Sequence, residues 1–203
     1  MTKISLRSII RSNLRSFRKL DYAIFFLVVP AIVLYLFSLS LDVKLQLVLN
    51  PVAPSPITMF TMNYVNIFDW QLRDDIVGYL FGILLIFLFS NNRKQLHAMS
   101  FFLFIVLPFI SSFVVLIMST VLLAAGFSAI AWSFIGYGFY TASRFVGHLG
   151  GSKALYLSFA ILFIFGLMVI VAQNPTVGIN VISHGAHLAG FIFGSFQIGR
   201  AHV

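Results

Sequence analysis

The sequence predicts an all-helical protein that crosses a lipid bilayer several times. Hydrophobic residues make up 60% of its 203 positions and charged residues only 9%, and its mean hydropathy is +1.02. A soluble domain carries about 25% charged residues. The apolar residues are gathered into runs close to the ~20 residues that a helix needs to cross a bilayer. We therefore expect one membrane domain over residues 22–203, preceded by a basic segment over residues 1–21.

The segment before the first apolar run is expected to be a basic amphipathic helix in the cytoplasm. Arg7, Arg11 and Arg15 recur at every fourth position, with apolar residues between them. This spacing is typical of a helix on an anionic membrane surface, and a solvated basic flank of a membrane helix fits it equally well. The net charge of +8 is therefore attributed to contact with the lipid bilayer, and no nucleic-acid partner is expected.

The expected membrane helices are six apolar runs, over residues 23–41, 70–89, 99–123, 126–146, 154–172 and 181–198. Pro108 is expected to kink the third of them, because proline removes a helical hydrogen bond. A long loop over residues 42–69 is apolar and aromatic, but prolines interrupt it. We expect this loop to lie partly in the membrane interface without crossing the bilayer.

The distribution of basic residues predicts the orientation of these helices. Eleven Lys and Arg residues fall on one side of the predicted membrane, and only Lys44 and Arg73 fall on the other. Basic residues are in excess on the cytoplasmic side of membrane proteins. The sequence therefore predicts a multi-pass protein of the cell membrane with both termini in the cytoplasm and the loop over residues 42–69 outside.

In this orientation the second, fourth and sixth helices all begin near the external surface. The polar residues near these three helix starts include Gln71, Asp75, Ser128 and His187. Ionisable and polar groups gathered at one depth of a membrane protein indicate a functional site by default.

The fourth run begins GFSAIAWSFIGYG, and the sixth contains HGAHLAGFIFG. Each has residues spaced for a single helix face: Ser128, Trp132 and Gly136, and then His187, Gly190 and Gly194. Small residues let helix backbones approach closely in membranes, so packing of these two faces would bring Ser128 to His187. A neutral imidazole beside a serine hydroxyl activates it as a nucleophile and then protonates the leaving amine.

Other interpretations of the same residues remain open. A serine near a helix start commonly bonds to the backbone, and a lone histidine is commonly structural. His184 and His187 have the i, i+3 spacing of two metal ligands, but no further ligand is evident nearby, so neither a metal nor another cofactor is expected. Trp132 is expected either to stack on the His187 ring or simply to pack beside it.

These two motifs resemble those of the rhomboid family of intramembrane serine proteases. That family has a six-helix core, a GxSG nucleophile motif on the fourth helix and a GAHxxG base motif on the sixth. The matching residues are Gly126, Ser128, Gly185, Ala186, His187 and Gly190. The resemblance, over about residues 60–194, implies a six-transmembrane-helix rhomboid-like bundle. It also implies a serine-type endopeptidase with a Ser128–His187 dyad that cleaves transmembrane segments, entering near the second and fifth helices.

The second helix departs from the family pattern. Rhomboids often read TxNYVHxxxxHLxxNxxGY here, where the second histidine and the asparagine help to stabilise the oxyanion. This chain reads TMNYVNIFDWQLRDDIVGY, so that Gln71 takes the place of that histidine and Asp75 that of the asparagine. Asn66 replaces an upstream histidine, and Ala129 replaces the glycine after the nucleophile.

These changes bear on catalysis because one oxyanion donor is worth about 3–4 kcal/mol. The Gln71 amide still donates, whereas an ionised Asp75 repels the oxyanion. A protonated Asp75, or backbone N–H groups near Ser128, would restore the missing donor.

Two alternatives follow from this sequence. The first is a proteolytically inactive rhomboid-like protein that binds the membrane helices of client proteins. The second is a small transporter or channel subunit that uses the polar cluster for permeation. The second is disfavoured, because the inner halves of the second, fourth and sixth runs are mostly apolar.

Overall fold

The computed structural model describes residues 6–118, 123–172 and 184–196. Within them the chain is helical apart from its connections and one isolated bridge between Leu49 and Ala124. In chain order the α-helices and π-helices are α1 (Leu6–Ser16), α2 (Lys19–Ala23), η1 (Ile24–Val28), α3 (Val29–Ser38), α4 (Leu41–Leu47), α5 (Pro56–Thr61), α6 (Asp69–Phe89), α7 (Arg93–Phe101), η2 (Phe102–Val106), α8 (Leu107–Met118), α9 (Ser128–Ala172) and α10 (His184–Phe196).

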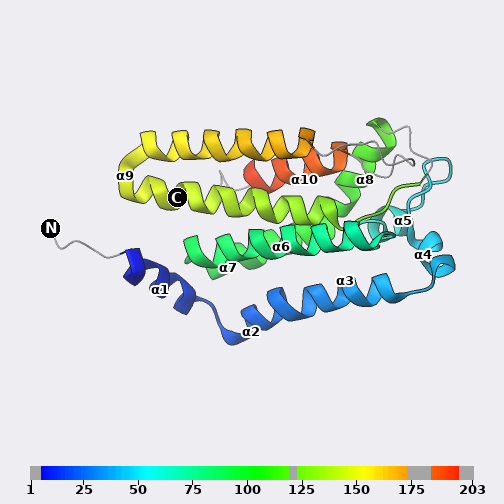
Figure 1. The fold of residues 1–203 in the computed structure, drawn as a ribbon, viewed down its shortest axis with the longest axis horizontal. Helices are drawn as coiled ribbons and strands as arrows, with labels where there is room; N and C mark the ends of the chain where they lie inside the picture. The colour runs from blue at the N-terminus through cyan, green and yellow to red at the C-terminus, as the bar shows by residue number, and fades with distance from the viewer. Residues whose placement is uncertain (1–5, 119–122, 173–183, 197–203) are drawn as a thin grey trace.

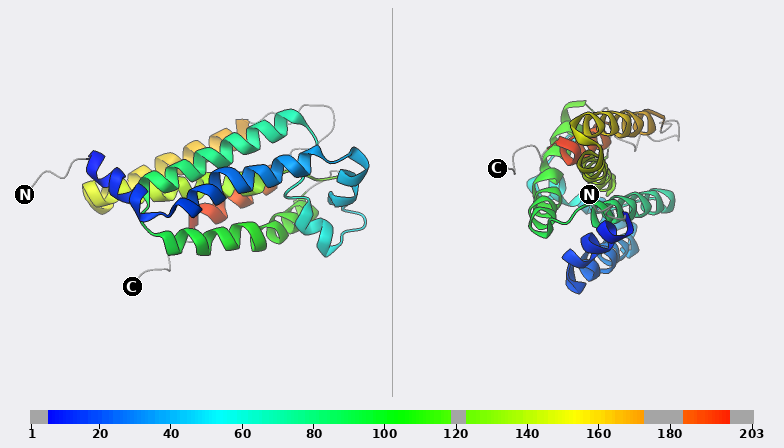
Figure 2. Two further views of the ribbon diagram at one scale, coloured as in Figure 1. Left: turned by 90° about the horizontal axis from the view of Figure 1, so that it is seen from below. Right: turned by 90° about the vertical axis from the view of Figure 1, so that its left-hand side faces the viewer.

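The long helices form an elongated bundle along one axis (Figure 1). α1 and the turn of α9 lie at one end, called here the α1 end. α4, α5 and the beginning of α9 lie at the opposite end, called the Ser128 end. The views of Figures 1 and 2 agree that α6 lies between α3 and α9.

Helices cover most of the described residues of all six predicted apolar runs. Three segments are long and apolar enough to cross a membrane, namely Lys19–Ser38, Arg93–Ile117 and Ser128–Ile170. The last of these folds back on itself at Gly151, whose φ of 81° and ψ of −177° interrupt the helix. α6 has 21 residues, but Arg73, Asp74 and Asp75 lie in its first two turns. The structure thus supports an apolar helical bundle, and the number of crossings stays a prediction.

Several predicted helix boundaries were wrong by a few residues. The third long helix begins at Arg93 and not near residue 99, because the Asn92 side chain caps it by accepting a hydrogen bond of 3.0 Å from the Gln95 backbone N–H. The fourth continues past Val146 to the turn at Gly151. Residues 181–183 and 197–198 of the sixth predicted run lie outside the described residues.

Two prolines in long helices are each preceded by a π-helical turn. η1 ends two residues before Pro30, and η2 ends two residues before Pro108. A proline ring clashes with the carbonyl four residues before it, and proline has no N–H to donate to that carbonyl. A π turn changes the hydrogen-bond register of the helix just before such a position. At Pro108 that carbonyl belongs to Phe104, and it accepts a hydrogen bond from the Tyr64 hydroxyl.

The loop over residues 42–69 folds onto the Ser128 end and contains α4 and α5. Asn63, which is fully buried, joins it to α8. The Asn63 amide nitrogen donates to the Pro108 carbonyl at 3.1 Å, and its amide oxygen accepts a bond of 2.6 Å from the Ser111 hydroxyl. The loop is therefore a packed part of the bundle, and its expected position in the membrane interface stays a prediction.

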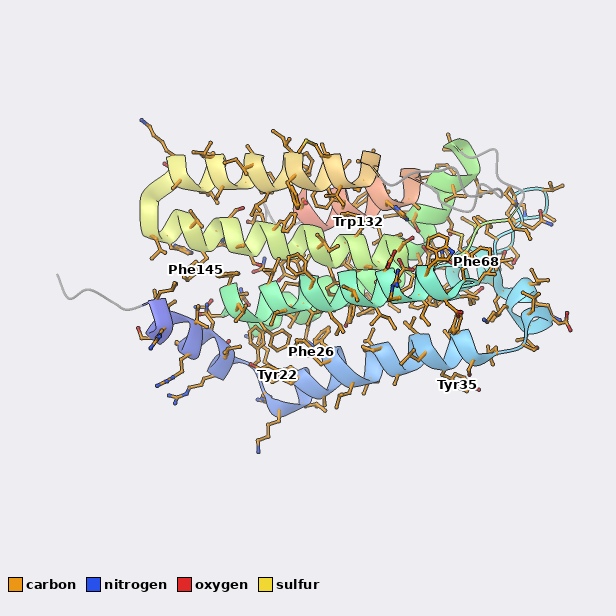
Figure 3. All side chains as sticks on the ribbon, viewed as in Figure 1. Tyr22, Phe26, Tyr35, Phe68, Trp132 and Phe145 are labelled. Atoms are coloured by element: carbon orange, nitrogen blue, oxygen red, sulfur yellow. The ribbon has the colours of Figure 1, made fainter. Side chains whose placement is uncertain are left out.

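Aromatic rings fill much of the space between the helices (Figure 3). Phe87 of α6 is surrounded by rings from the first sixth of the chain: Phe17 at 4.3 Å between centroids, Tyr22 at 4.6 Å, Phe26 at 5.5 Å and Phe25 at 6.1 Å. These contacts hold the N-terminal helices against α6 near the α1 end.

Candidate active site

The predicted contact between the glycine-bearing faces of α9 and α10 is present. A Cβ atom built on Gly190 would lie 2.1 Å from the Ala129 carbonyl oxygen, and one on Gly194 would lie 1.9 Å from the Ser133 carbonyl oxygen. Only glycine allows the two backbones to approach this closely. This contact fixes the register of α10 on α9 along several turns.

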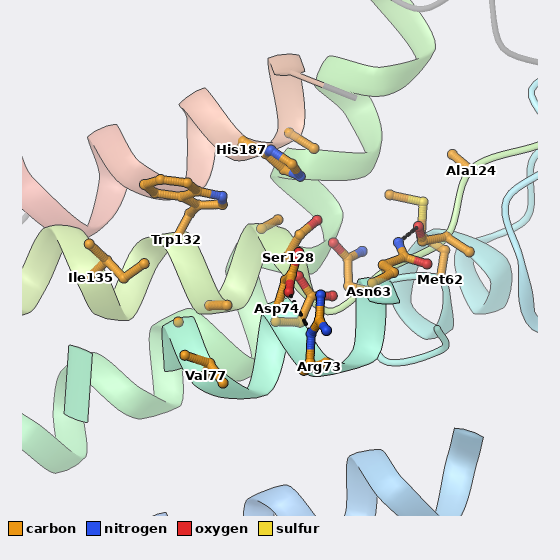
Figure 4. A pocket seen from close by; sticks show the side chains of 18 of the residues that line it. Met62, Asn63, Arg73, Asp74, Val77, Ala124, Ser128, Trp132, Ile135 and His187 are labelled. Carbon is orange, nitrogen blue, oxygen red and sulfur yellow. Dashed lines mark hydrogen bonds and ion pairs between the residues drawn. The ribbon is translucent and has the colours of Figure 1, made fainter. Parts of the chain in front are cut away.

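The same register brings Ser128 and His187 to one site. Ser128 is the first residue of α9, and His187 lies in the first turn of α10. Their side chains point toward one another across the gap between the two helices (Figure 4). Both line a cavity of about 860 Å³, and His187 is only 7% exposed.

Trp132 lies one turn below Ser128 and lines the same cavity. Its ring centroid is 6.2 Å from that of His187, with the planes inclined by 30°. A second, edge-on contact with Phe191 has a centroid separation of 6.0 Å. Both lie toward the long end of the usual 4.5–7 Å range of aromatic pairs, so Trp132 forms one wall of the site beside the imidazole.

The segment that leads into Ser128 is held by hydrogen bonds from distant parts of the chain. Leu49 pairs with Ala124 through bonds of 2.9 and 3.0 Å, and the Gly126 N–H donates to the Met62 carbonyl at 2.8 Å. The Phe127 N–H donates to the Asn66 side-chain oxygen at 2.8 Å. The loop over residues 42–69 therefore positions the residue proposed as nucleophile.

Gln71 lies directly against this segment. Its amide nitrogen donates to the Ala125 carbonyl at 2.8 Å, and a Cβ atom built on Gly126 would lie 2.2 Å from that nitrogen. Gly126 also has a φ of 143°, which side chains disfavour. Gly126 is thus required for two reasons, its backbone conformation and the approach of Gln71. One amide hydrogen of Gln71 is used by Ala125, which leaves the second for a group in the cavity.

Asp75 lies one helical turn after Gln71 and lines the same cavity. It is 7% exposed, and its carboxyl lies next to the Asn66 side chain and the Phe127 backbone N–H. Its Oδ2 atom has no hydrogen-bond partner among the described residues. An acidic group so close to Ser128 would oppose a developing oxyanion if it were charged.

The start of α9 offers backbone donors to the cavity. The first hydrogen bond into this helix is donated by the Ala131 N–H to the Phe127 carbonyl at 3.0 Å. The N–H groups of Ser128, Ala129 and Ile130 precede it and have no intrahelical partner. Helix N-termini favour negative charge, so these groups can stabilise an oxyanion formed at Ser128.

Structural roles of Asn63, Tyr64 and Asn66, which lie together in the string TMNYVN, were not predicted. Their hydrogen bonds join the loop to α8, to the carbonyl before Pro108 and to the turn before Ser128. Buried polar groups need such partners. Asn63 and Asn66 are fully buried and Tyr64 is half-buried, so polar residues within an apolar loop were the feature of the sequence that could have indicated these roles.

Among the described residues no group of three side chains suited to a metal comes together. The helix α10 begins at His184, whose side chain lies outside the described part of the chain. No protein-family model matches the sequence, and comparisons with characterised proteins and with solved structures found no similar protein. The function is therefore inferred from the geometry of the site and from the two motifs.

Proposed function

We propose that this chain is an intramembrane serine endopeptidase of the rhomboid type, with Ser128 as nucleophile and His187 as general base. The observation that carries the proposal is the glycine contact between α9 and α10, which turns two distant motifs toward one cavity. His187 takes the Ser128 proton as the hydroxyl attacks a peptide carbonyl, and returns it to the leaving amine. The first N–H groups of α9, with the second amide hydrogen of Gln71, bind the oxyanion.

The substrates proposed are transmembrane segments of other membrane proteins. The cavity is lined on one side by α6 residues and on the other by residues from both halves of α9, including Val77 and Val169. Val77 is 62% exposed, so the cavity extends to the outer surface of the bundle. An apolar segment arriving from the lipid would enter between α6 and the second half of α9.

The proposal includes a six-helix crossing with both termini in the cytoplasm. It is supported by helices over most of the described residues of all six apolar runs and by the excess of basic residues in the predicted cytoplasmic segments. In this orientation the cavity opens near the external surface, where water for hydrolysis is available.

The first test is covalent labelling of the detergent-solubilised protein by a fluorophosphonate probe. Wild type should label, Ser128→Ala should not, and His187→Ala should label at least about 100-fold more slowly because it lacks the base. Ser133→Ala is a matched control, since the Ser133 hydroxyl is bonded to the Ile130 carbonyl at 2.6 Å. His148→Gln, at the α1 end, controls for loss of a histidine. Absence of labelling in folded wild type at every pH from about 4 to 9 would reject the proposal.

The acidic side chain of Asp75 in the cavity beside Ser128 favours the inactive alternative. This alternative is a protein that binds membrane helices of client proteins without cutting them. Asp75→Asn distinguishes the two, because an asparagine amide is a neutral donor of similar shape. If the protein is a protease hindered by a charged Asp75, labelling of Asp75→Asn at neutral pH should exceed that of wild type, and wild type should label faster in acid. If neither protein labels while both retain an uncut transmembrane reporter, the alternative is correct.

A further inference from the structure

A second cavity forms a groove between the N-terminal helices and the third long helix. It has a volume of about 430 Å³, and η1 and α3 form one wall while α7 and η2 form the other. Tyr64 and Phe127 line it toward the Ser128 end. At its rims Val28, Ile32 and Phe101 are 48%, 49% and 66% exposed, so the groove opens to the surroundings of the bundle.

The walls of this groove favour an apolar ligand. Their described side chains are aliphatic or aromatic, except for those of His97 and Ser100. The His97 ring is bonded to Asp21 at 2.8 Å, and the Ser100 hydroxyl is fully buried. The Tyr64 hydroxyl already donates to the Phe104 carbonyl. A ligand in the groove would therefore be held mainly by dispersion contacts with apolar side chains.

The same walls suit a hydrocarbon chain better than a transmembrane helix. Helices in membranes approach one another through small residues, as α10 approaches α9 at Gly190 and Gly194. Among the described residues that line the groove there is no glycine or alanine. Its rims instead carry β-branched and aromatic side chains, which keep the backbone of a second helix away. A flexible acyl chain can follow such a surface.

Exposed basic residues lie at the end of the groove near α2. Lys94 precedes His97 by three residues and so lies on the same face of α7, and Lys19 begins α2. Both lysines are exposed, and neither has an ion pair among the described residues. The Asp21 carboxylate at this end is fully buried and is bonded to Arg93 and His97. The two lysines can therefore attract an anionic group to this end of the groove.

We propose that this groove holds an acyl chain of an anionic phospholipid whose head group lies at Lys94 and Lys19. The predicted orientation places these lysines on the cytoplasmic side, where basic residues next to membrane helices attract anionic lipids. The proposal requires that the bundle lies in a bilayer, and it is independent of any catalysis at Ser128.

The first part of the test changes the groove. The full chain in neutral detergent is titrated with dioleoyl phosphatidylglycerol or dioleoyl phosphatidylcholine, and bound lipid is counted by native mass spectrometry. Ile32→Trp should weaken the binding of both lipids about fivefold, because the indole covers space in which the chain makes its dispersion contacts. Leu34→Trp is the matched control, since Leu34 of α3 is also 49% exposed but is not among the residues lining the groove. This control should bind lipid as wild type does, and both variants should keep the wild-type thermal midpoint.

The second part changes the head-group contact. Wild type should bind phosphatidylglycerol more tightly than phosphatidylcholine. Lys94→Gln should weaken the binding of phosphatidylglycerol about fivefold, as expected for the loss of one basic contact, and leave that of phosphatidylcholine unchanged. Lys153→Gln removes the same charge from an exposed position just after the turn at Gly151. It should change either affinity less than about twofold, because no contact with the bound lipid is lost.

Equal binding of the two lipids by wild type would overturn the proposal, and so would equal effects of Ile32→Trp and Leu34→Trp. The same spectra report the oligomeric state. A wild-type dimer that Ile32→Trp dissociates and Leu34→Trp does not would assign the groove to a second copy of the chain instead of a lipid.

Discussion

The contact of α9 with α10 depends on glycines, whereas the contact of the N-terminal helices with α6 depends on aromatic rings. Along one face of α9 and α10 the two backbones touch, because Gly190 and Gly194 lie where any Cβ would meet a carbonyl oxygen within about 2 Å, and rings such as Trp132 and Phe191 pack beside this line. Between α2, η1 and α6 the space is filled by large rings grouped around Phe87. At the α1 end of the second contact, the buried Asp21 carboxylate is bonded to the half-buried side chains of Arg93 and His97.

This difference indicates where the molecule needs precision. The proposed Ser128–His187 dyad would require hydrogen-bond distance between two side chains on separate helices, and a close contact of the two backbones holds those helices in a fixed register. Aromatic rings adapt to small shifts, so the N-terminal contact can hold a helix without fixing its register. The site lies at the first kind of contact, and the second kind secures the bundle around it.

The comparison predicts the largest effect for Gly194→Ala. The added methyl group would meet the Ser133 carbonyl at 1.9 Å, and neither backbone can move without separating α9 from α10. We expect a loss of about 2–3 kcal/mol of stability, measured by unfolding in mixed micelles. Fluorophosphonate labelling should fall toward the level of Ser128→Ala, because His187 moves with α10.

Gly78→Ala is the matched control for this substitution. A Cβ on Gly78 would lie 3.3 Å from the end of the flexible Ile135 side chain, which can shift. Alanine is also favoured over glycine in a helix by about 1 kcal/mol, so this variant should be as stable as wild type or more so. A Gly194→Ala protein as stable as Gly78→Ala would show that the backbone contact is not as close as described.

A smaller effect is expected at the ion cluster of the second contact. Asp21 is fully buried, and both of its oxygens accept bonds from Arg93, at 2.6 and 3.0 Å. Asp21→Asn keeps the shape but removes the charge from these bonds, which should cost about 2 kcal/mol. Labelling of Ser128 in the folded protein should be unchanged, because the cluster is at the opposite end of the bundle.

The double variant Asp21→Asn, Arg93→Gln completes this test. Once the charge of Asp21 is gone, removal of Arg93 should cost little more, so the two effects should be far from additive. Additive effects would mean that the two residues stabilise the protein separately.

The sequence predicted the parts of this architecture that depend on periodicity. Apolar length located the six helical runs, and the four-residue spacing of Ser128, Trp132 and Gly136 predicted the face that α9 turns toward α10. The sequence did not predict that Gly138, two residues further, lies on the opposite face. There a Cβ would lie 2.9 Å from the Gly82 carbonyl oxygen of α6. Glycines two apart in a helix face different neighbours, and only the position of α6 reveals the second neighbour.

The polar contacts of the loop over residues 42–69 were also beyond prediction. Asn66 stood where the family pattern has a histidine, but nothing in its neighbours indicates that its oxygen accepts the N–H of Phe127, 61 positions away. Gln71 was expected to face the site, but its hydrogen bond to the Ala125 carbonyl was not predicted, because that bond depends on how the loop folds over Gly126. Long-range hydrogen bonds of single side chains leave no periodic pattern to detect.

The smallest expected effect concerns a third kind of contact, in which one hydroxyl compensates for a proline. The Phe104 carbonyl loses its helical donor because Pro108 has no N–H, and the Tyr64 hydroxyl donates to it instead. Tyr64→Phe should therefore cost about 1 kcal/mol in the same unfolding measurement. In a Pro108→Ala background the helix supplies its own N–H to Phe104, so the same change should cost almost nothing. An equal cost in both backgrounds would show that Tyr64 contributes through packing, as the rings around Phe87 do, and not by replacing the missing bond.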